Sequence, residues 1–271
     1  MAKYYYLISS LPELFFEAGD SKNLDFLHIR NYILEKISDR DSVYVRDLLS
    51  SIDNHNLISA IYDKNRDWKK GGRLESPSPD SWDRSLMPEY MLRFLEYIDG
   101  YRAEHRANPE ELAAEKYLLE LCYSEMENSD NAFIAKWFSF DREMKNILAA
   151  YSGRRLGISP EDYLIGKDEV TEFLLKNTGP DFGLSRERDY IPELFRTLEI
   201  PNTLERENRL DMFRWNRINE INIMEYFSLD VALGILMKAH VADRWMALDS
   251  GEGKKMFRKL VDDLLEFKKI E

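Results

Sequence analysis

Apolar side chains recur every three or four residues along most of this chain after Pro88, with only short breaks between the runs. The run that follows Pro88 shows the pattern, with Met91, Leu92, Leu95 and Ile98 on one face. Residues at this spacing form one face of an α-helix, and that face packs against a neighbouring helix. Because alternating strand patterns are almost absent, the sequence predicts an all-α fold built from many helices.

Several residues predict where helices begin and end. Pro109 suits the first turn of a helix, since proline lacks the N–H that has no partner there. Asp130 is expected to cap a helix that ends at Gly153, and a short helix is expected to begin at Ser159-Pro160-Glu161. Further helices are expected at 167–176, 188–198, 202–226, 228–247 and 252–269.

A segment rich in glycine, proline and serine divides the 271-residue chain at residues 70–88. Such a composition disfavours both a helical face and a paired strand. We therefore predict a mainly helical N-terminal module at 1–69, a loop or linker at 70–88, and a helical core at 89–271.

Two features of the N-terminal module remain open or local. The stretch from Tyr4 to Ile8 fits either a short extended segment or the first turn of a helix. Asp53 is placed to cap a helix that continues through Leu57 and Ile61.

The chain resembles itself at an offset of 89 residues. The sequence WFSFD at 137–141 matches YFSLD at 226–230, and the match continues weakly across about 133–157 and 222–246. These segments are either an internal repeat or two amphipathic helices that share a pattern by chance.

Charge and cysteine content exclude several classes of protein. The chain has 50 acidic and 38 basic residues, for a net charge of −12, which is the wrong sign for a nucleic-acid-binding protein or for direct adsorption to anionic lipid. The single cysteine, Cys122, cannot form an internal disulfide and is expected in the core. With no signal peptide and no apolar run of about 20 residues, we expect a cytoplasmic protein without lipid insertion.

A search for catalytic patterns gives little. The histidines are dispersed and form no HExxH pair, and no phosphate-binding loop or nucleophile elbow is present; the four histidines are His28, His55, His105 and His240. We expect no catalytic residue, no cofactor and no metal. The alternative is a helical metal-dependent hydrolase or transferase that uses Asp262, Asp263 and Glu266, of which the first and last share a helix face.

One segment, residues 138–166, carries a family resemblance. Its sequence is FSFDREMKNILAAYSGRRLGISPEDYLIG, and the positions that matter are Asp141, Asn146-Ile147, Arg154-Arg155, Gly157, Ser159-Pro160-Glu161 and the Leu164-Ile165 pair before Gly166. This order resembles the rotor-linker subunit of archaeal and bacterial V-type ATPases and its counterpart in the eukaryotic enzymes. Asp141 and Lys145 also form a favourable i, i+4 pair. Arg154 and Arg155 suit either the negative end of a helix or a neighbouring carboxylate, or are ordinary surface arginines.

Two further stretches are similar to related proteins. Residues 204–245 resemble the closing helices of the same rotor-linker family, with Lys238 and Arg244 at family positions, whereas Ala239 replaces a glutamate and Asp243 an asparagine. The opening YYYLISSLPEL is similar to that of an uncharacterised bacterial family encoded beside V-type ATPase subunits. Together these resemblances cover about half of the chain.

The resemblance implies a funnel of similar helical modules with no catalytic role. Such a protein would connect the membrane rotor ring to the central stalk and transmit rotation between ATP hydrolysis and proton or sodium transport. Its partners would be rotor-ring (proteolipid) and central-stalk subunits, and it would sit on the inner face of the membrane through the complex. In isolation we expect a monomer. A helical adaptor unrelated to any rotor is a further alternative.

Overall fold

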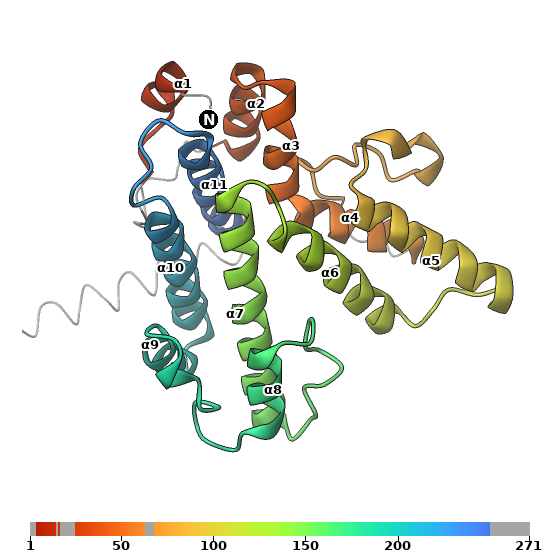
Figure 1. Ribbon diagram of the computed structural model, residues 1–271, viewed down its shortest axis with the longest axis vertical. Helices are drawn as coiled ribbons and strands as arrows, with labels where there is room; N and C mark the ends of the chain where they lie inside the picture. The colour runs from red at the N-terminus through yellow and green to blue at the C-terminus, as the bar shows by residue number, and fades with distance from the viewer. Residues whose placement is uncertain (1–3, 15, 17–24, 63–67, 250–271) are drawn as a thin grey trace, which may run out of the picture.

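The computed structural model describes residues 4–14, 16, 25–62 and 68–249. Within these ranges the chain forms α-helices and short 3₁₀ helices and no β-strand, so the prediction of an all-α fold is confirmed (Figure 1). The α-helices are α1 Tyr5–Ser10, α2 Phe26–Lys36, α3 Asp39–Leu48, α4 Ser50–Ile61, α5 Glu89–His105, α6 Glu111–Glu127, α7 Ala132–Leu156, α8 Glu169–Lys176, α9 Ile191–Leu198, α10 Thr203–Ile221 and α11 Leu229–Asp249; the 3₁₀ helices are η2 Pro79–Ser81, η3 Arg84–Leu86 and η4 Leu184–Arg186.

Helix α7 lies at the centre of the molecule. It contacts α3, α6, α8, α10 and α11, while α5 and α6 pack together and extend to one side (Figure 1). The core around it is made of large apolar side chains that are fully buried, among them Phe94, Phe133 and Ile134. None of the helices in the described ranges is both long and apolar enough to cross a membrane.

The N-terminal stretch forms a helix, which settles the choice that the sequence left open. Helix α1 buries Leu7, and the Tyr4 N–H donates to the Phe227 carbonyl at 2.7 Å. The Tyr4 hydroxyl also donates to the Asp41 carboxylate. Because the described part of the chain offers no strand for pairing, a helix satisfies the backbone of this segment where an extended conformation would not.

The segment after α4 is held by two buried polar side chains of that helix. Asp53 lies inside α4 and does not cap it, which corrects the sequence prediction; its carboxylate accepts hydrogen bonds from the N–H groups of Arg73 (2.6 Å) and Leu74 (3.0 Å). The Asn56 amide donates to the Lys69 carbonyl at 2.8 Å and accepts from the Lys69 N–H at 3.0 Å. A segment with little helical character is thereby fixed against a helix.

Both predicted ends of α7 are displaced. The cap at its N-terminus is Asn131, whose side chain accepts from the Ile134 N–H at 2.9 Å, and not Asp130. The helix passes through Gly153 and ends at Leu156, where Gly157 adopts the left-handed conformation with φ of 68°. Gly153 serves another purpose, because a Cβ there would lie 2.8 Å from the Ile158 carbonyl oxygen.

Replacing Gly157 with alanine is expected to lower the free energy of unfolding by about 1 kcal/mol, because an L-residue is strained at this φ. A Cβ at Gly157 would meet no other atom within 4 Å, so backbone strain is the only cost. Gly100→Ala is the matched control, since Gly100 lies exposed inside α5 with equally open space around it, and this change should stabilise by about 0.5–1 kcal/mol. Urea denaturation of both variants measures these effects, and equal effects would contradict the assignment of Gly157 as the helix terminator.

The two segments matched at an offset of 89 differ at their start. Trp137 and Phe138 are buried within α7, whereas Tyr226 and Phe227 are exposed in the turn that precedes α11. The matched apolar positions further on are buried in both helices: Met144 with Leu233, Ile147 with Leu236, and Ala150 with Ala239. The internal repeat and the funnel of similar modules stay predictions.

Candidate functional site

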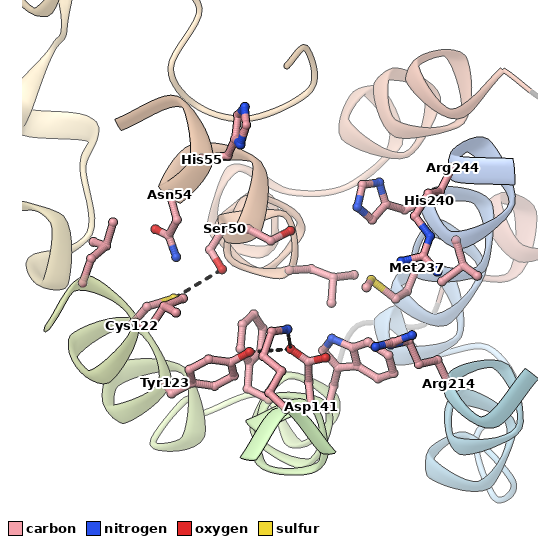
Figure 2. Close-up of a pocket in the computed structure, with 18 of the residues that line it drawn as sticks. Ser50, Asn54, His55, Cys122, Tyr123, Asp141, Arg214, Met237, His240 and Arg244 are labelled. Carbon is pink, nitrogen blue, oxygen red and sulfur yellow. Dashed lines mark hydrogen bonds and ion pairs between the residues drawn. The ribbon is translucent and has the colours of Figure 1, made fainter. Parts of the chain in front are cut away.

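A central cavity of about 360 Å³ lies between α4, α6, α7, α10 and α11. Figure 2 shows Ser50, Asn54 and Cys122 on one side of it and Arg214 and Arg244 on the other. Its volume falls at the lower end of the range for small-molecule pockets. Five helices from distant parts of the sequence therefore meet around one hollow.

Asp141 lies on α7 at the bottom of this cavity. Its carboxylate accepts hydrogen bonds from the Tyr123 hydroxyl at 2.5 Å and from Lys145 Nζ at 2.6 Å, which confirms the predicted i, i+4 pair. Burial alone would raise the pKa of Asp141, but the charges of Lys145 and Arg214 and these hydrogen bonds hold that pKa below its ordinary value. Asp141 is therefore a fixed negative charge at neutral pH.

Asp211 on α10 joins two arginines at the opposite wall. Its side chain is almost fully buried, and it accepts hydrogen bonds from Arg214 Nη1 at 2.7 Å and from Arg244 Nη2. Glu207 lies 3.8 Å from the same guanidinium of Arg244. Arg244, a residue of the family resemblance, thus ties the end of α11 to α10.

His240 is the other titratable group of α11 at the cavity. Its ring packs on Phe26, with the ring centroids 5.0 Å apart, and its Nδ1 is buried without a hydrogen-bond partner. Burial, together with the positive charges of Lys69 and Arg244, lowers the pKa of His240 to about 4, although Asp211 acts in the opposite direction. The imidazole is therefore neutral at physiological pH.

Cys122 is buried in the cavity wall, as predicted for a core residue, and its thiol donates to Ser50 Oγ at 3.5 Å. Burial raises the pKa of the Cys122 thiol, which keeps it protonated and unreactive.

The charges that line the cavity balance. Three basic side chains, Lys145, Arg214 and Arg244, face three acidic ones, Asp141, Asp211 and Glu115. Among the residues that the structure describes, no group of three or more His, Cys, Asp or Glu side chains is arranged to hold a metal ion. Balanced charges and apolar walls suit a polar side chain or a neutral polar molecule better than a free ion.

Asn146 lies on α7 away from the cavity and is buried. Its Nδ2 donates to the Ile165 carbonyl at 2.9 Å, and its Oδ1 accepts from the Ile165 N–H at 2.8 Å. Asn146 therefore binds a loop and not the end of a neighbouring helix. Pro160 begins a turn in this loop and not the predicted short helix, because the chain must reverse after Gly157 to bring Ile165 back to α7.

Arg154 belongs to the last turn of α7, whereas the sequence predicts a position after the helix. Its guanidinium donates to the carbonyls of Gly179 (2.5 Å) and Asn177 (2.9 Å) and lies 3.7 Å from the centroid of the Phe182 ring. It fixes the connection between α8 and α9, and its partners are carbonyl oxygens and an aromatic ring rather than a carboxylate.

The remaining residues of the resemblance lie apart from one another. Arg155 is exposed, with its guanidinium 5.8 Å from the Tyr151 ring. Lys238 Nζ lies 5.1 Å from the Trp215 ring on another face of α11, and burial lowers the pKa of Lys238. The structure thus brings Asp141 and Arg244 to one cavity and leaves Asn146, Arg154, Arg155, Gly157 and Lys238 elsewhere. The acidic cluster Asp262, Asp263 and Glu266 lies outside the described residues.

Sequence reasoning missed the other members of the cavity and one further arginine. Asp211 and Arg214 are three residues apart on α10, a spacing that could have identified them. Arg142 binds both carboxylate oxygens of Glu127 (2.5 and 3.2 Å) and Asp168 at 2.6 Å, which joins α6, α7 and the start of α8. Only the folded chain reveals this second network.

Comparison with curated proteins gives no match, and comparison with solved structures gives none either. The sequence profile of one protein family matches residues 1–267, which is nearly the whole chain. The chain therefore belongs to the family described as "Protein of unknown function (DUF2764)".

Proposed function

We propose that this protein is a non-catalytic linker subunit of a V-type ATPase, placed between the membrane rotor ring and the central stalk. It would transmit rotation between ATP hydrolysis and the transport of protons or sodium ions. The observation that carries the proposal is the order of residues in segment 138–166, from Asp141 through Asn146, Arg154 and Gly157 to Ile165.

The contacts of these residues support a mechanical role. Asn146 fixes the loop after α7, Arg154 fixes the connection after α8, and Gly157 ends α7. Each of them holds one part of the chain against α7. A part that transmits torque must resist deformation, and multiple ties to one central element provide that resistance.

The length and ties of α7 support the same role. The helix has 25 residues and is therefore about 37 Å long. Arg142 in its middle joins it to Glu127 of α6 and to Asp168 at the start of α8. A long helix braced on several sides transmits force along its axis with little bending.

The charge of the chain fits attachment through proteins. A net charge of −12 opposes direct binding to anionic lipid, so a protein with this charge reaches the membrane surface through other subunits. In the proposed complex these subunits are the rotor-ring (proteolipid) subunits and the central stalk.

The proposal is tested by affinity purification of the tagged protein from gently solubilised membranes of its native host. Rotor-ring and central-stalk subunits are expected to co-purify, and deletion of the gene is expected to abolish ATP-driven ion transport in membrane vesicles. Recovery of neither kind of subunit would refute the proposal.

A variant sharpens this experiment. Arg155 is the exposed residue of the resemblance whose side chain only lies over Tyr151, so Arg155→Glu should leave the fold unchanged. We expect it to weaken recovery of the partners, whereas Arg186→Glu, an exposed charge reversal in η4, should not.

A further inference from the structure

An exposed apolar patch lies where α1 meets the turn between α10 and α11. Six large side chains are exposed there, and Tyr6 (93%), Met224 (79%) and Ile223 (72%) are the most open of them. We call this surface the Tyr6 patch; its members are Tyr5, Tyr6, Ile223, Met224, Tyr226 and Phe227. In Figure 1 the turn (blue) lies beside α1 (red) at the top of the molecule. Contiguous exposed apolar surface on a folded protein is typical of an interaction site.

Direct contacts hold the two halves of the patch together. The Tyr5 and Phe227 rings pack with their centroids 4.7 Å apart, and the Tyr4 N–H donates to the Phe227 carbonyl at 2.7 Å. Segments separated by most of the sequence thus form one surface. Tyrosine and methionine are also enriched in protein interfaces relative to the rest of a protein surface.

An acidic groove adjoins the patch. It has a volume of about 480 Å³, and Tyr4 and Leu229, the chain neighbours of the patch, line it. Three carboxylates, those of Asp41, Asp130 and Asp230, also line the groove, against the single guanidinium of Arg40.

The carboxylates of the groove are differently engaged. Asp41 accepts from the Tyr4 hydroxyl, and Asp230 accepts from Asn131 Nδ2 at 2.7 Å. Burial and the nearby Glu225 raise the pKa of Asp230, although the Asn131 hydrogen bond and Lys136 oppose this. Since burial makes its negative charge unfavourable, a cation in the groove would stabilise that charge.

We propose that the Tyr6 patch and the acidic groove together bind a protein segment that carries aliphatic or aromatic side chains next to a lysine or arginine. The apolar side chains cover the patch, and the cationic one enters the groove. Charge complementarity selects this occupant, because the carboxylates repel an anionic bilayer and would repel the identical groove of a second copy. The inference is independent of the rotor-linker proposal.

Site-specific photo-crosslinking in native host cells tests the proposal. A photo-reactive phenylalanine analogue at position 6 is expected to crosslink to one polypeptide, at a site where mapping finds apolar residues beside a lysine or arginine. The control position is Tyr163, which is also exposed but lies in the loop after α7, and it should give no such product.

A charge reversal in the groove provides the second arm. Asp130→Lys should lower the crosslinking yield from position 6 about fivefold, as expected for a charge pair at the edge of an interface. Asp130 is exposed and does not cap α7, so the variant should keep the melting temperature of the original protein. Asp162→Lys, an exposed reversal outside the groove, is the matched control and should leave the yield unchanged.

The other outcomes would overturn the proposal. These are crosslinking to a second copy of the chain, to lipid, or to a segment without a cation, equal yields from positions 6 and 163, and the absence of any product. An identified partner that is unrelated to an ATPase would leave this inference intact and refute the rotor-linker proposal.

Discussion

Replacing Asn146 with alanine is expected to lower the free energy of unfolding by about 3 kcal/mol, because two buried backbone groups lose their partners at once. The Asn146 side chain is 1% exposed and pairs with both the N–H and the carbonyl of Ile165. Alanine is too short to replace either hydrogen bond, and Ile165 is itself buried. Urea denaturation followed by tryptophan fluorescence measures the effect as a fall in the transition midpoint.

Asn128→Ala is the matched control for this prediction. The Asn128 side chain also donates to a carbonyl, that of Ser124 at 2.7 Å, but it is exposed, so water replaces the lost bond. Its effect should stay within about 0.5 kcal/mol, as for most surface substitutions. Equal effects of the two changes would show that the pairing with Ile165 contributes little to stability.

Lowering the pH from about 6.5 to about 4 is expected to cost the protein up to about 3 kcal/mol of stability through His240 alone. Burial and the charges of Lys69 and Arg244 lower the pKa of His240 to about 4 in the folded protein. The folded state therefore binds fewer protons than the unfolded state in this window. The stabilising contribution is complete above the unfolded pKa and is lost as the pH falls towards the folded pKa.

The measurement is the difference between the original protein and His240→Gln in urea unfolding at several pH values. This difference removes the contribution of the carboxylates, which titrate in both proteins. We expect the variant to lose less stability between pH 6.5 and 4. His105→Gln should leave the pH dependence unchanged, because His105 is exposed and lies at the end of α5. A parallel pH dependence in all three proteins would contradict the burial of a neutral imidazole.

The helical fold could be predicted because its signal is local. Apolar spacing and the prolines at 88 and 109 place α5 and α6 within two residues of their starts. The ends of α7 could not be predicted, since Asp130 and Asn131 are both good caps, and only the return of the chain over Gly153 shows why that glycine does not terminate the helix. Tertiary contacts decide between local signals of equal strength.

The cavity could be predicted only in part for the same reason. Asp141 and Lys145 share one helix, and their pairing follows from spacing. Tyr123, Asp211 and His240 reach the cavity from three other helices, and no local pattern relates them. Packing angles between helices determine which of these side chains meet, and these angles depend on every side chain at each helix contact.

The pairing of Asn56 with Lys69 and of Asn146 with Ile165 follows one design: a single side-chain amide on a helix replaces an entire strand as the partner of a loop residue. Anchorage at one point leaves the rest of each connection free to change in length. Peptide tags inserted at residues 76–80 should therefore be accommodated, whereas insertions next to either anchored residue would displace it from its amide.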